Sequence, residues 1–238
     1  IFVGDNKLMG NNKEKYKEAI EASIENGRRL LEDSERLRDS ERFPTAKALA
    51  ILAQEEFAKA YIIRLVQEGA IPWCAEIRRA TTDHLCKQLM GIVMEYLFTP
   101  WDVESRQERE RRPKVKFPDP LLPGKVADAL NIFCNEKIMG WKSSPVGWAG
   151  DPKYDVEAKK VWNGKFEKSK QDATYVSIGK DGEVINTPLV DSDDANKHIE
   201  YAKVLEEVST GQDWCLAPTE RAYIWSALKN MFDSIYIK

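Results

Sequence analysis

Apolar residues recur at three- and four-residue intervals through the first hundred positions of the chain, which is the pattern of amphipathic helices. The intervals predict a long helix from about 13 to 40 and a second helix that ends at Gly69, a natural helix stop. A third helix is predicted from Pro72 to about Phe98. Because each helix has one apolar face, the three must cover one another, which predicts a bundle with core helices over about 13–98.

The second half of the chain carries further helical patterns and one alternating stretch. Residues 99–123 are rich in proline and in charge, and we expect a loop insertion there. The stretch "ATYVSIGKDGEVINTP" alternates polar and apolar residues around "GKDG", which predicts a small β-hairpin near 174–187. Helical spacing predicts additional helices over about 125–141, 191–209 and 218–236.

These elements predict a mostly α-helical protein with a single domain over 1–238, in which 124–238 supplies the C-terminal helices and the hairpin. Apolar residues make up 42% of the chain and charged residues 32%, which excludes a disordered chain. The net charge of -3 is too small to indicate nucleic-acid binding by itself, so basic patches must be sought locally.

Several function classes lack support in the sequence. No stretch approaches the roughly 18 uninterrupted apolar residues that a membrane helix needs, and the opening "IFVG" is too short for the core of a signal peptide. The four cysteines are widely spaced, which indicates reduced thiols. No phosphate-binding glycine loop, nucleophile elbow or metal motif occurs. We therefore expect a cytoplasmic protein with no membrane contact, no cofactor and no metal.

The stretch "IRRATTDHLCKQ" contains one of the two histidines of the chain. On a continuous third helix, His84 would project away from the apolar stripe and lie near Lys87, which favours a solvated or site histidine over a core one. Arg78 and Arg79 precede it by six and five positions, and this spacing alone is a weak signal. A sufficient explanation for Arg79 is a salt bridge to Asp83 at i,i+4, worth a few tenths of a kcal/mol.

A carboxylate on the second helix is a further candidate. Glu56 falls near the centre of that helix's apolar stripe, where a charge is costly unless it is paired. Lys59, one turn on, is its local partner, although an arginine or histidine from the third helix would serve as well. A structural ion pair and a role in a site are about equally supported.

Two other charged features favour an ordinary surface. The run 106–116 contains six basic residues against two acidic ones, which suits a phosphate backbone but is more often a solvated surface. His198 lies among acidic residues, and we expect it on the surface.

The segment "GRRLLEDSERLRDSERFPTAKALAILAQEEFAKAYII" resembles the opening of the abortive-infection V (AbiV) proteins of bacterial phage defence. The hallmark of that family is an alanine- and leucine-rich helix that ends in Glu-Glu and is followed closely by lysine, here Ala48 to Lys59. A histidine with a lysine three positions later is matched by His84 and Lys87. A "YV" strand before a turn is matched by "TYVSIGKDGEV". The resemblance spans about 25–100 and 173–187.

The AbiV family looks like a branch of the HEPN superfamily (higher eukaryotes and prokaryotes nucleotide-binding). Many HEPN proteins are metal-independent ribonucleases with an arginine, four to six residues, then a histidine, and Arg78 or Arg79 with His84 satisfies this spacing. Such ribonucleases often have a polar residue after the arginine. Arg79 is followed by Ala80, which favours Arg78 and leaves the choice open.

The resemblance implies a HEPN-like helical bundle that cleaves RNA as an abortive-infection effector. His84 would exchange protons near neutral pH, an arginine would clamp the scissile phosphate, and Lys87 would contact a second phosphate. The resemblance further implies a homodimer, an RNA substrate and a phage-encoded activator protein. The supporting residues would be Glu56, Lys59 and Asp83.

Two other functions stay open on the sequence. The first is a non-catalytic HEPN interaction protein that blocks translation or senses a phage protein by binding. The second is a helical module in which the same Arg/His/Lys group holds nucleotide phosphates without cutting.

Overall fold

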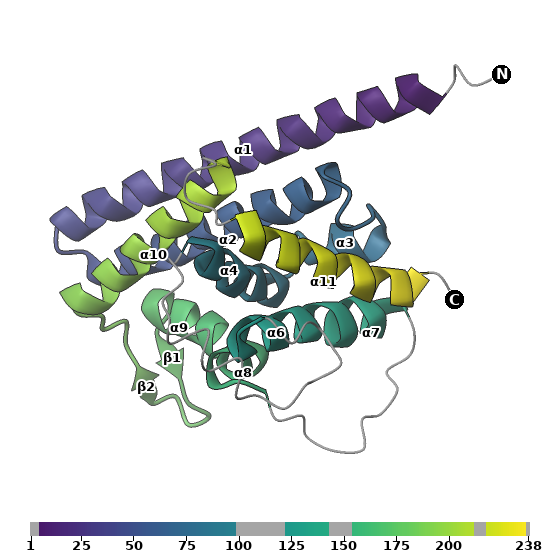
Figure 1. Ribbon diagram of the computed structural model, residues 1–238. Helices are drawn as coiled ribbons and strands as arrows, with labels where there is room; N and C mark the ends of the chain where they lie inside the picture. The colour runs from purple at the N-terminus through teal and green to yellow at the C-terminus, as the bar shows by residue number, and fades with distance from the viewer. Residues whose placement is uncertain (1–4, 99–121, 143–153, 212–217, 237–238) are drawn as a thin grey trace.

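The computed structural model describes residues 5–98, 122–142, 154–211 and 218–236, and these form a helical bundle with one small hairpin (Figure 1). The mostly α-helical fold class is thereby confirmed. Most of the loop insertion expected at 99–123 lies outside the described residues.

Helices α1 (Asp5–Asp39) and α2 (Phe43–Gln67) form a long pair joined by a short turn (Figure 1). Gly27 of α1 faces the ring of Phe57, so closely that a Cβ atom on Gly27 would lie 2.5 Å from a ring carbon. Glycine at this position therefore lets the two helices approach.

Helix α2 is the central element of the bundle, because α1, α4, α9 and α10 all pack against it. Its buried residues lie on every side of the helix, and three of them are polar or charged: Lys47, Gln54 and Glu55. A helix surrounded in this way must supply partners for such groups. Lys47 Nζ pairs with Asp194 on α10 (Ser192–Thr210) at 2.6 Å.

The single helix expected from 72 to 98 is wrong, because the chain forms α3 (Ala75–Ala80) and then α4 (His84–Phe98). The hydroxyls of Thr81 and Thr82 each donate to the carbonyl oxygen three residues earlier, which competes with helix continuation. A side-chain oxygen of Asp83 then accepts from the backbone N three positions on at 2.9 Å, as an N-cap does. The sequence Thr-Thr-Asp thus ends one helix and starts the next.

The helix predicted over 125–141 is confirmed as one continuous run, whose middle portion is π-helical. Two short helices after it carry too few apolar residues to be seen as a pattern in the sequence, and both lie beside α4. The run consists of α6 (Gly124–Asn131), η1 (Ile132–Met139) and α7 (Gly140–Lys142). The two short helices are α8 (Val156–Trp162) and α9 (Lys165–Thr174).

The predicted hairpin is confirmed as β1 (Ser177–Ile178) paired antiparallel with β2 (Val184–Asn186). Gly182 lies in the turn with a φ of 83°, a left-handed conformation that glycine adopts at little cost. The two predicted C-terminal helices are confirmed as α10 and α11 (Pro218–Tyr236).

A single cluster of buried apolar side chains runs from Ile20 on α1 to Ile235 on α11. Within the ranges described, no helix is both long and apolar enough to cross a membrane. The three cysteines in these ranges, Cys74, Cys86 and Cys134, are free thiols, as predicted.

Candidate functional site

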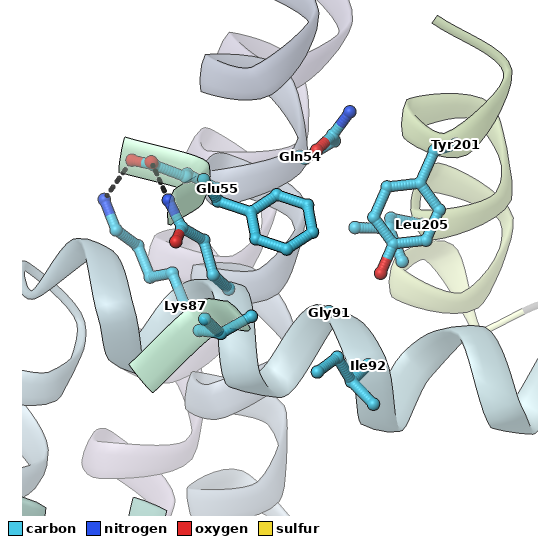
Figure 2. A pocket seen from close by; sticks show the side chains of 10 residues that line it. Gln54, Glu55, Lys87, Gly91, Ile92, Tyr201 and Leu205 are labelled. Carbon is cyan, nitrogen blue, oxygen red and sulfur yellow. Dashed lines mark hydrogen bonds and ion pairs between the residues drawn. The ribbon is translucent and has the colours of Figure 1, made fainter. Parts of the chain in front are cut away.

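A buried carboxylate, Glu55 of α2, is the centre of a polar cluster built from three helices. Its side chain is only 2% exposed. The Oε2 atom lies 2.5 Å from Nδ1 of His84 and 3.0 Å from Nζ of Lys87, both on α4. The Oε1 atom accepts from Nζ of Lys170 on α9 at 3.1 Å and from Nε2 of Gln88 at 3.2 Å. Figure 2 shows Lys87 reaching toward Glu55.

The partners of Glu55 decide its charge state. Burial alone raises the pKa of this carboxyl, but the charges of Lys87 and Lys170 and the hydrogen bonds from Lys87 and His84 act in the opposite direction. The net effect holds the pKa of Glu55 below its ordinary value. Glu55 is therefore an ionised group at neutral pH.

His84 is the first residue of α4, and its side chain is 48% exposed. Because Glu55 is ionised, it accepts the proton on Nδ1 of His84, which leaves Nε2 as the acceptor nitrogen. Nε2 makes no hydrogen bond to any part of the chain that the structure describes. His84 is thus held from behind by a buried carboxylate and is open to solvent on its other side.

Two residues of α9 complete the cluster, and the sequence analysis missed both. Nζ of Lys170 lies 2.7 Å from Oε2 of Glu167 and 3.3 Å from Nδ1 of His84. Lys170 is buried on the same face of α9 as Ala173, three positions later. This shared face is the only signal that could have indicated Lys170, and it requires that α9 be predicted first.

The side chains of Glu55, His84 and Glu167 bring their ligand atoms within 4.8 Å of one another. Two ammonium groups, from Lys87 and Lys170, already contact these carboxylates. A divalent cation would have to displace them, so the donor set fits a metal poorly.

The structure separates the two arginines from His84. Both Arg78 and Arg79 are exposed on α3, and the guanidinium of Arg79 lies 4.3 Å from the centre of the Trp141 ring. In the described ranges neither arginine forms a hydrogen bond or ion pair with His84. Ala80 is fully buried, so packing requires a small apolar residue after Arg79.

The salt bridge expected between Arg79 and Asp83 is wrong, because the helix ends between them. Asp83 caps α4 and pairs with Nζ of Lys137 at 3.1 Å. Burial raises the pKa of Asp83, but hydrogen bonds from the Cys86 amide and from Lys137 outweigh it and lower the pKa. Asp83 thus fixes the start of the helix that carries His84.

Glu56 pairs with Lys59 at 2.6 Å, as expected, but this pair does not reach His84. The carboxylate that does so is Glu55, one position earlier. The expectation for Glu56 assumed that α2 has a single buried face. Because α2 is buried on all sides, the apolar stripe does not identify the side that meets α4.

The prediction that His198 lies on the surface is also wrong. Its side chain is 12% exposed, and its backbone oxygen accepts from Nε2 of Gln54 at 2.7 Å. Burial, reinforced by the charge of Lys47 and opposed by that of Asp194, lowers the pKa of His198 to about 4. His198 is a neutral packing residue between α10 and α2.

A cavity of about 30 Å³ lies beside Glu55 and is closed at its far end by Tyr201 and Leu205 of α10 (Figure 2). Its lining is mostly apolar, and its volume is enough for about two water molecules. It is too small for a nucleobase. A substrate would therefore meet the cluster from the exposed side of His84.

A family model described as AbiV (HEPN_AbiV) matches residues 15–207. The chain belongs to the AbiV family. The matched range includes every residue of the cluster around Glu55, so this cluster belongs to the family domain. No curated protein and no solved structure matches this AbiV protein.

Proposed function

We propose that this AbiV protein is a cytoplasmic endoribonuclease that cleaves RNA without a metal ion and acts as an effector of abortive infection. The observation that carries the proposal is the environment of His84. A general base needs a ring that is held in place and a nitrogen that is open to the substrate. The contact of Nδ1 with Glu55 and the half-exposed ring provide both.

In the proposed reaction, Nε2 of His84 takes the proton of an RNA 2′-hydroxyl. The 2′-oxygen attacks the neighbouring phosphorus in line, the bond to the 5′-oxygen breaks, and that oxygen takes a proton from solvent. The products are a 2′,3′-cyclic phosphate and a 5′-hydroxyl. Glu55 stabilises the imidazolium while it exists and fixes its orientation.

Arg78 and Arg79 remain the candidates for the phosphate clamp, because α3 ends at the turn that leads directly into His84. Stacking on Trp141 fixes the plane of the Arg79 guanidinium, which suits bidentate binding of a phosphate. Lys87 is assigned a different role from the one expected. Its side chain is 8% exposed and pairs with Glu55, so it holds the carboxylate rather than a phosphate.

The proposed assembly is a homodimer that presents two His84 sites to one RNA, with a phage-encoded protein as the trigger. A homodimer would supply a second arginine and histidine set, and each chain holds a single set. Glu56, Lys59 and Asp83 support the fold around the site in this proposal and do not contact RNA.

The product ends test this function. The protein, with EDTA present, is incubated with an RNA and with the same RNA carrying 2′-O-methyl groups throughout. We expect 2′,3′-cyclic phosphate and 5′-hydroxyl ends from the first and no cleavage of the second, because the methyl group blocks the nucleophile. Equal cleavage of both, or cleavage of neither under infection-like activation, would contradict the proposal.

One observation favours the non-catalytic alternative. Both lysines near His84 are already paired with carboxylates, so the cluster also serves as a structural ion-pair centre. A protein that acts by binding alone would stay toxic in cells after His84→Ala. It would lose toxicity through surface changes, for instance in 106–116, which lies outside the described residues.

A further inference from the structure

The segment 174–194, which contains the hairpin, has no buried residue. Six of its large apolar side chains are at least half exposed, and they are six of the nine large apolar residues exposed on the described part of the chain. The six are Tyr175 (64%), Val176 (52%), Ile178 (58%), Val184 (59%), Ile185 (67%) and Leu189 (86%). Scattered apolar residues are normal on a surface, but a cluster in one short segment indicates an interaction site.

Neither face of the hairpin packs on the helices. Val184 and Ile185 are neighbours in β2, so their side chains point to opposite faces of the sheet, and both are exposed. Figure 1 shows the hairpin at the edge of the molecule, below α9 and α10. A two-stranded hairpin without support is only marginally stable in water. The hairpin therefore needs a covering partner.

We propose that the partner is a second copy of this chain, with the two β2 strands paired antiparallel across a two-fold axis in one four-stranded sheet. Such pairing can be centred on Ile185, which then meets its own copy. Val184 lies opposite Asn186 of the other copy, and Glu183 lies opposite Thr187. No two like charges face each other, so the edge is complementary to itself.

The exposed apolar area is of the size that such a contact requires. Burial of one aliphatic side chain yields roughly 1.5–3 kcal/mol at about 25 cal/mol per Å², which corresponds to roughly 60–120 Å² per residue. Six residues then present roughly 400–700 Å², against about 800 Å² per partner in a standard interface. The strand backbone and the hairpin flanks supply the remainder.

The test compares the same substitution at two exposed positions. Ile185→Glu places a carboxylate opposite its own copy, whereas Val156→Glu changes a residue that is 68% exposed at the start of α8, outside the hairpin. By sedimentation equilibrium we expect wild type and Val156→Glu to dimerise equally. The dissociation constant of Ile185→Glu should rise at least tenfold, with thermal unfolding of the monomer unchanged.

A second variant addresses the geometry directly. Ile185→Cys should form an intermolecular disulfide on mild oxidation, because the pairing brings position 185 next to its own copy, and wild type should not. A wild-type protein that stays monomeric would overturn the proposal. A dimer that Ile185→Glu leaves as tight as Val156→Glu does would also overturn it. RNA cleavage does not enter these measurements, so their outcome is independent of the proposed function.

Discussion

Glu55 and Glu56 are adjacent, identical in type and different in environment. Glu55 has four donors around a carboxylate that is 2% exposed, whereas Glu56 pairs with one lysine near the protein surface. We expect Glu55→Gln to lower the free energy of unfolding by about 3 kcal/mol, because it leaves buried ammonium groups without their counter-charge. Glu56→Gln should cost about 1 kcal/mol or less. Chemical denaturation measures both, and equal losses would contradict the assignment of Glu55 as the central group.

His198 gives the protein a pH dependence above the range of its carboxylates. Its pKa is about 4 in the folded protein and about 6.5 in an unfolded chain. As the pH falls below 6.5 the unfolded state takes up a proton first, so stability is lost between about pH 6.5 and pH 4. The loss should reach about 3 kcal/mol at the lower limit.

Urea denaturation at a series of pH values measures this loss. The carboxyls with lowered pKa, Glu55, Asp83 and Asp194, lose their stabilisation only below the pKa of an unfolded carboxyl, about 4. The slope between pH 6.5 and pH 5 therefore belongs to His198, and His198→Gln should flatten it. A wild-type protein equally stable at both limits would show that this histidine is not buried and neutral.

At the scale of elements, the close approach of α1 to α2 depends on one glycine. Gly27→Ala would place a methyl group against the ring of Phe57, which is fully buried and has little room to move. We expect a loss of about 1–3 kcal/mol from overpacking. Gly140→Ala is the matched control, because nothing lies within 4 Å of the added atom, and alanine there should be neutral or stabilise by up to about 1 kcal/mol. Thermal unfolding distinguishes the two, and a neutral Gly27→Ala would contradict the packing described.

The turn between α3 and α4 shows how an element boundary decides the chemistry of a site. A continuous helix would carry Arg79 and His84 on one rigid rod, with Asp83 as a salt-bridge partner. The break instead makes Asp83 the cap of α4, frees its other oxygen for Lys137, and puts His84 at a helix start beside Glu55. Three residues, Thr-Thr-Asp, carried the signal for this break, because each of their side chains can bond to nearby backbone.

At the scale of the whole molecule, the helices with clear periodicity and the hairpin were predictable from the sequence, as was His84 as a candidate. These predictions rest on local patterns, which a single sequence carries. The polar cluster was not predictable, because Lys170 is 115 positions from Glu55 and lies on a short helix with only two buried residues. Which side of α2 meets α4 is likewise a property of the assembled bundle, and so Glu56 was favoured over Glu55.

The two histidines of the chain offer the most direct test of the central claim, that His84 is the acid–base group of an RNA-cleaving site. Cleavage of one RNA in EDTA is measured for wild type, His84→Ala and His198→Gln, each verified as folded by circular dichroism. We predict that His198→Gln cleaves at close to the wild-type rate and that His84→Ala is slower by about 100-fold or more, the usual contribution of a general base. Cleavage by His84→Ala at the wild-type rate would contradict the account.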